Sequence, residues 1–127
     1  MTIKQHLRFY ARIKGVSSNI REEHINDLLA AVELTEKADT ASKKLSGGMK
    51  RRLSIAIALA CKPKVLIFDE PSSGLDVRTR RELWNVIIKA RQGRAVLLTT
   101  HAMEEAECLS TRIAIMATGK IRCIGNV

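Results

Sequence analysis

Apolar residues recur at helical spacing over the first 45 residues and predict two amphipathic helices. The segment Thr2-Ile3-Lys4-Gln5 fits a capping box at the start of the first helix, which Gly15 ends as a left-handed cap. The second helix is expected to begin near Ser17 or Ser18. Its apolar stripe consists of Ile25, Leu28, Leu29 and Val32. The polar stretch 35–44 has no period and is predicted to be a loop.

The third predicted helix, from Lys50 to Cys61, lacks a polar face along most of its length. Nearly every residue from Leu53 onward is apolar, which indicates burial on several sides. Its first turns carry the basic residues Lys50 to Arg52, so that end is expected to face water. Pro63 ends the helix.

Strands and helices alternate over the remainder of the chain. Val65–Phe68 is a continuous apolar run, as expected of a central strand in a parallel sheet. A helical pattern from about Arg78 to Gln92, closed by Gly93, leads into a second buried strand at Ala95–Thr99. A short acidic helix is expected at 103–109. A third strand at 113–116 is expected to turn at 118–120 into 121–124 and so form a final hairpin. This order is typical of an α/β sandwich with a parallel sheet.

Composition excludes several classes of protein. The 127 residues contain no run approaching the roughly 20 apolar residues that span a bilayer, and no secretory signal begins the chain, so we expect a soluble chain. The net charge of +9 suggests nucleic-acid binding, but the basic residues are scattered and only 3% of residues are aromatic, so no nucleic acid is expected as a partner. The three cysteines lack C-x-x-C spacing and are expected to be reduced and mostly buried.

Ser46, Gly47 and Gly48 directly precede the third helix. The first amides of a helix have no intrahelical partner and attract anions, and glycine lets backbone approach a phosphate closely. Ser46 can act as the N-cap or donate its hydroxyl to an oxygen. The segment therefore predicts a phosphate site.

Three further polar residues follow the two predicted strands. Asp69 and Glu70 end the first strand, and His101 follows the second. The carboxyl ends of parallel strands share one edge of a sheet, where ligands bind in open α/β folds. An aspartate there can hold magnesium, and the adjacent glutamate can orient or deprotonate a water. Because strand side chains alternate, Glu70 is expected to point away from Asp69.

Taken together, these motifs resemble those of the nucleotide-binding domain of ABC transporters. Leu45-Ser46-Gly47-Gly48-Met49 is similar to the signature motif, and Val65-Leu66-Ile67-Phe68-Asp69-Glu70 to the Walker B strand. Ser73-Gly74-Leu75-Asp76 resembles the D-loop, and His101 the switch histidine. The residues that follow the signature and His101 look most like the A-type subfamily of lipid exporters.

The resemblance implies a role for each motif residue. Asp69 would coordinate Mg²⁺, Glu70 would polarise the attacking water, and His101 would sense the γ-phosphate of ATP. Ser46, Gly47 and Gly48 would bind the ATP held by an opposed domain, and Asp76 would communicate across the dimer. The implied partners are a second nucleotide-binding domain and transmembrane domains, which places the chain at the cytoplasmic face of a membrane.

The P-loop of this family, G-x-x-x-x-G-K-[ST], does not occur among the 127 residues. We therefore expect the second half of a nucleotide-binding domain: an α/β, partial P-loop NTPase (RecA-like) three-layer sandwich with parallel strands and an N-terminal helical subdomain. The subdomain with the signature motif would span about 1–62, and the RecA-like part about 63–127. An ATPase that lacks its phosphate cradle is expected to be inactive alone.

Two other functions stay open at this point. The chain could be a non-catalytic interaction module that docks on an intact nucleotide-binding domain. The basic charge alone suggests the other, a nucleic-acid-binding protein.

Overall fold

The computed structural model describes all 127 residues and begins with two packed helices, α1 (Ile3–Ile13) and α2 (Ser18–Ala31). The predicted capping box is confirmed: the Gln5 amide donates to the Thr2 hydroxyl at 3.2 Å, and the Thr2 amide donates to the Gln5 side chain at 2.8 Å. Gly15 takes a φ of +78° beyond the end of α1. The stretch 35–44 is less irregular than expected, because it contains 3₁₀ turns at Thr35–Lys37 and Ser42–Lys44.

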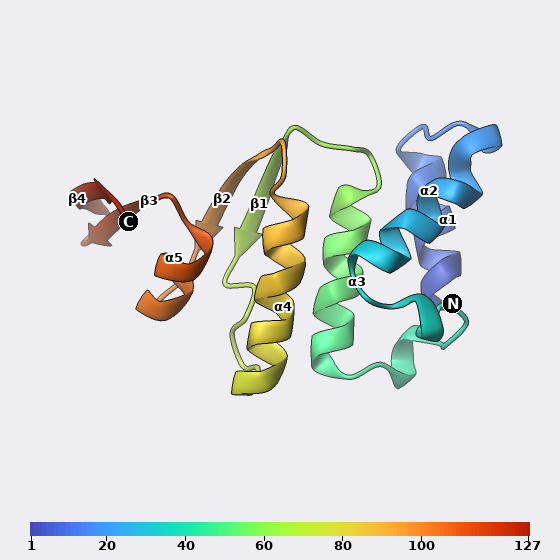
Figure 1. Ribbon diagram of the computed structural model, residues 1–127, viewed down its shortest axis with the longest axis horizontal. Helices are drawn as coiled ribbons and strands as arrows, with labels where there is room; N and C mark the ends of the chain where they lie inside the picture. The colour runs from blue at the N-terminus through green and yellow to red at the C-terminus, as the bar shows by residue number, and fades with distance from the viewer.

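Helix α3 (Gly47–Leu59) lies among the other helices and contacts α1, α2 and α4 (Val77–Ala90) (Figure 1). It begins at Gly47 rather than at Lys50, because the Ser46 side chain caps it. Leu53, Ile55 and Ala56 are buried in these contacts. The prediction of burial on several sides is thus confirmed.

The parallel sheet consists of β1 (Val65–Asp69) and β2 (Ala95–Thr99), which α4 connects. The register pairs residue 65 with 95 and continues to 69 with 99. Leu66 and Phe68 are buried, whereas Val65 is 58% and Ile67 69% exposed. The prediction of a central strand is wrong here: β1 has one neighbouring strand, and only one face of the sheet is covered.

The chain ends with helix α5 (Met103–Leu109) and an antiparallel hairpin of β3 (Arg112–Ala117) and β4 (Lys120–Asn126). The short acidic helix is confirmed with its predicted bounds. Strand β3 pairs with β4 and not with β2, so the structure contains two separate two-stranded sheets.

The elements follow one another along the longest axis of the molecule. Figure 1 shows α1 and α2 at one end, then α3, α4 and the parallel sheet, and the hairpin at the other end. The mixed α/β class with parallel strands is confirmed. None of the helices is both long enough and apolar enough to cross a membrane.

The cysteines are free, as expected, but all three are exposed. Cys61 lies in the turn after α3, Cys108 on the outer side of α5, and Cys123 in β4, where no residue is buried. The prediction of mostly buried thiols is therefore wrong.

Candidate functional site

Glu70 and His101 meet at the carboxyl edge of the parallel sheet. Because β1 and β2 run in the same direction, their last residues, Asp69 and Thr99, lie side by side. His101 Nδ1 is 2.8 Å from Glu70 Oε2. The His101 side chain is 77% and the Glu70 side chain 38% exposed, so both groups are accessible to a ligand.

Glu70 owes its position to the turn that follows β1. It adopts a φ of +46°, in the left-handed region that non-glycine residues seldom enter, and it precedes Pro71. Its amide donates to the Thr99 carbonyl at 3.0 Å, and its carbonyl accepts from the Ser73 amide at 3.2 Å. The alternation of a regular strand does not extend to Glu70, so its orientation follows from this turn.

Asp69 is hydrogen-bonded to Thr99, a residue that the sequence pattern did not single out as part of the site. The Thr99 hydroxyl donates to Asp69 Oδ1. The structure contains no cluster of three or more His, Cys, Asp or Glu side chains able to hold a metal ion. Magnesium in nucleotide sites is held by one or two carboxylates together with phosphates, so the single carboxylate of Asp69 fits that limited role.

The signature glycines have different surroundings. Ser46 is the N-cap of α3, where its Oγ accepts from the Met49 amide at 3.2 Å. Gly48 is buried, and a Cβ there would lie 2.2 Å from Cγ2 of Thr79. A Cβ at the exposed Gly47 would lie 3.9 Å from the nearest side-chain atom. Gly48 is therefore required by the packing of α3 on α4, whereas Ser46 and Gly47 face solvent.

Asp76 is the N-cap of α4 and accepts from the Thr79 amide at 3.1 Å. Hydrogen bonds from Thr79 lower the pKa of the exposed Asp76 carboxyl. Since Thr79 also packs on Gly48, the signature segment and the Asp76 turn are neighbours. No hydrogen bond or ion pair joins this group to Glu70 and His101, although the amino ends of α3 and α4 and the carboxyl ends of β1 and β2 point to the same side of the molecule (Figure 1).

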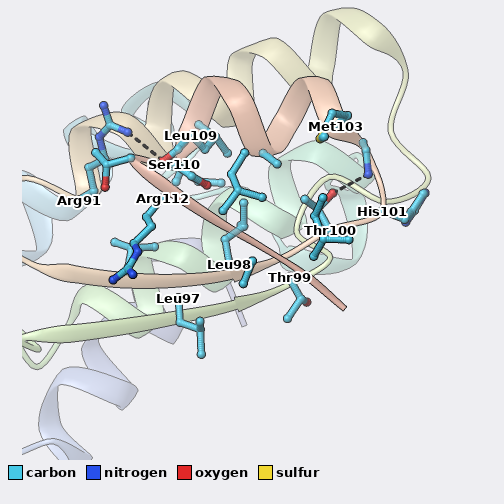
Figure 2. A pocket seen from close by; sticks show the side chains of 18 of the residues that line it. Arg91, Leu97, Leu98, Thr99, Thr100, His101, Met103, Leu109, Ser110 and Arg112 are labelled. Carbon is cyan, nitrogen blue, oxygen red and sulfur yellow. Dashed lines mark hydrogen bonds between the residues drawn. The ribbon is translucent and has the colours of Figure 1, made fainter. Parts of the chain in front are cut away.

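A groove of about 990 Å³, which His101 helps to line, lies between β2 on one side and α5 and β3 on the other. Figure 2 shows Thr99, Thr100 and His101 at one end of it and Arg91 and Arg112 at the other. Arg91 Nη1 donates to the Leu109 carbonyl at 2.9 Å and so attaches the end of α5 to α4. The unpaired edges of β2 and β3 both border this groove.

The fold and the site together define the class of protein. Acidic residues and a histidine at the ends of parallel strands, in a chain that also contains a helix beginning with glycines, are the features of part of a P-loop NTPase core. The comparison with known proteins narrows this class. The ABC transporter family model matches residues 1–73. The chain belongs to the ABC transporter family.

Several of its relatives are members of the A family. ABC transporter A family member 11 of Arabidopsis thaliana is 49% identical over 99% of this chain, which covers 13% of that protein. Phospholipid-transporting ATPase ABCA3 of Mus musculus is 48% identical over 99% of the chain, which covers 7% of it. ABC transporter A family member 7 of Dictyostelium discoideum is 43% identical over the same share, which covers 15% of it. The chain thus spans a small part of the length of these relatives.

Proposed function

We propose that this chain forms part of the ATP-hydrolysing site of an ABC transporter that moves lipid. The contact of 2.8 Å between His101 and Glu70, at the carboxyl edge of the parallel sheet, carries this proposal. It places a carboxylate and an imidazole together where open α/β sheets bind ligands. A relative named as a phospholipid-transporting ATPase supports the choice of lipid as the substrate.

Each polar group at the sheet edge has a chemical role in this proposal. Glu70 orients and polarises the water that attacks the γ-phosphate, since a carboxylate is a suitable base at hydrogen-bond distance. His101 fixes the Glu70 carboxylate and offers its other ring nitrogen to the γ-phosphate. Asp69 supplies an oxygen to Mg²⁺, an ion that neutralises phosphate charge when it is bound.

Ser46, Gly47 and Gly48 contribute to a second ATP, held by an opposed nucleotide-binding domain. Ser46 and Gly47 are exposed at the amino end of α3, a 13-residue helix whose first amides attract anions. Asp76, next to them through Thr79, links the two domains. We propose that this site works together with a second nucleotide-binding domain and with transmembrane domains, at the cytoplasmic face of the membrane, because the relatives of this chain are transporters.

The test is Glu70→Gln in a transporter that carries this sequence. The amide keeps the shape of the side chain but cannot act as a base, so ATP turnover should fall at least about 100-fold, with ATP binding retained. Glu107→Gln changes an exposed acid of α5 and is the matched control, expected to leave turnover unchanged. Turnover within a factor of two of wild type in Glu70→Gln would contradict the proposed role.

The lack of a P-loop also favours a second function, that of a module that docks on an intact nucleotide-binding domain without turnover. In that case the 127-residue chain should change the ATPase rate of an intact domain when it is added in excess. Tight ATP binding by the chain alone would contradict this alternative and the expectation that it is inactive alone.

A further inference from the structure

We propose that Thr99 is a positioning residue that sets the geometry of both Asp69 and Glu70. This inference deepens the proposed function and takes its functional meaning from it. Thr99 is the last residue of β2 and lies directly opposite Asp69 in the parallel register. It is also the residue through which the turn after β1 is attached to the neighbouring strand.

Thr99 makes three hydrogen bonds with the two acidic residues. Its hydroxyl donates to Asp69 Oδ1. The Glu70 amide is shared between the Thr99 carbonyl, at 3.0 Å, and the Thr99 hydroxyl oxygen, at 3.2 Å. A hydroxyl has one donor hydrogen and two lone pairs, so it can donate to Asp69 and accept from Glu70 at the same time.

Glu70 needs such a support because of its backbone. A left-handed conformation directly before a proline is sparsely populated, and it persists only where the surroundings hold it in place. Two of the contacts that hold it come from Thr99, and a third comes from the Ser73 amide on the Glu70 carbonyl. In this conformation the Glu70 carboxylate reaches His101.

The same hydroxyl orients Asp69. It occupies Oδ1, which leaves Oδ2 of this exposed carboxylate for another ligand. The Thr99 hydroxyl therefore separates the two acidic residues. One oxygen of Asp69 is held by this hydroxyl, whereas the Glu70 carboxylate is turned toward His101. Valine has the branched shape of threonine but neither the donor nor the acceptor, so Thr99→Val removes the hydroxyl contacts alone.

Nuclear magnetic resonance of the 127-residue chain, without nucleotide, tests this inference. In the wild type we expect one χ1 rotamer at Thr99 and a cross-peak between the His101 ring and the Glu70 side chain. In Thr99→Val this cross-peak should be lost and the Asp69 carboxyl carbon should shift. Thr99→Ser, which keeps the hydroxyl, should restore both signals. Thr118→Val, which removes a hydroxyl from the exposed turn between β3 and β4, is the matched control and should change neither.

If the cross-peak between His101 and Glu70 is as strong in Thr99→Val as in the wild type, the inference is overturned. If Thr99→Val does not fold, two other results decide: rotamer averaging at Thr99 in the wild type, or loss of the cross-peak in Thr99→Ser, would each overturn it. Because these measurements involve no ATP, they are independent of the Glu70→Gln result. ATP turnover in Glu70→Gln within a factor of two of wild type would contradict the proposed function, but it would not contradict the inference about the contacts of Thr99.

Discussion

The helices before residue 62 and the strands after residue 90 are held together in different ways. In the helical part, α1 and α2 bury Ile3, Leu7 and Ile25 completely. After Ala90 the buried residues are Glu105 and Leu109, both on α5, and the β3–β4 hairpin buries none. The helices therefore form a packed core, whereas the hairpin is held by backbone hydrogen bonds. Glu70 lies between these regions in the chain, after β1, whereas His101 follows β2 at the start of the second region.

The largest difference between the two regions should appear on truncation of an apolar side chain. Leu29→Ala removes a side chain that is 2% exposed, and we expect the free energy of unfolding to fall by about 2–5 kcal/mol, because a cavity forms in a close-packed core. Ile121→Ala in β4, where the side chain is 61% exposed, should change it by no more than about 0.5 kcal/mol. Urea denaturation followed by circular dichroism measures both. Equal losses in the two variants would refute the comparison.

The two signature glycines should respond differently to a methyl group. Gly48→Ala places Cβ 2.2 Å from Thr79 Cγ2, and we expect the free energy of unfolding to fall by about 1–3 kcal/mol because of overpacking. Gly47→Ala has room for its Cβ and should be neutral or stabilise α3, because alanine is the better helix former by roughly 0.5–1 kcal/mol. Thermal denaturation compares the two.

The double variant with Thr79→Ser tests the cause of the Gly48 effect. Serine lacks Cγ2 and keeps the backbone amide that caps α4, so it should recover most of the loss in Gly48→Ala. If it recovers none, the packing of α3 on α4 is not the reason for the glycine. Activity lost in Gly48→Ala would then have to come from the site itself.

A buried polar pair attaches helix α5 to α4, in addition to the burial of Leu109 in the core and the Arg91 hydrogen bond. The Trp84 indole donates to Glu105 Oε1 at 2.9 Å, and Glu105 is 1% exposed. Trp84→Phe removes the indole donor and leaves the buried Glu105 carboxylate without this hydrogen bond. We therefore expect the free energy of unfolding to fall by about 1–3 kcal/mol. A double-mutant cycle with Glu105→Leu should give a coupling of at least about 0.5 kcal/mol, and Glu107→Leu, on the exposed side of α5, should show none.

The features that are periodic or local in the chain were predictable from the sequence. The capping box at Thr2 follows from side-chain types at fixed spacing, and the short acidic helix α5 from the local pattern of residues 103–109. The proximity of Glu70 and His101 follows from the rule that parallel strands end at one edge. The family motifs around Ser46 and Asp69 also lie within single stretches of the chain.

The features that depend on tertiary contacts could not be predicted in this way. The left-handed φ of Glu70 contradicts its local preference and is supported by Thr99, which lies 29 positions further along the chain. An apolar run such as Val65–Phe68 shows that a strand is apolar on both faces, but not whether both faces are covered. The exposure of Cys61 could not be predicted either, because it depends on which residues lie beside the turn after α3.

The smallest expected effect concerns two acidic residues whose pKa is lowered, one in the helical part and one at the start of α4. The Arg8 guanidinium, hydrogen-bonded to Glu22, lowers the pKa of that carboxyl in the helical part, and Thr79 lowers that of Asp76 at the start of α4. A carboxyl with a lowered folded pKa stabilises the fold above its unfolded pKa, and the contribution is lost as pH falls through the folded value. For Asp76 the loss therefore begins below about pH 4.

Asparagine is as good an N-cap as aspartate but does not ionise. Asp76→Asn should therefore be close to wild type at pH 7 and lose less stability than wild type between about pH 4 and pH 2, a window that follows from the unfolded pKa near 3.9. Urea midpoints across this range measure the difference, with Glu23→Gln, an exposed acid of α2, as the control. Because Glu22 still titrates, part of the acid loss should remain in Asp76→Asn. An identical pH profile in wild type and variant would mean that Asp76 does not contribute to the acid sensitivity.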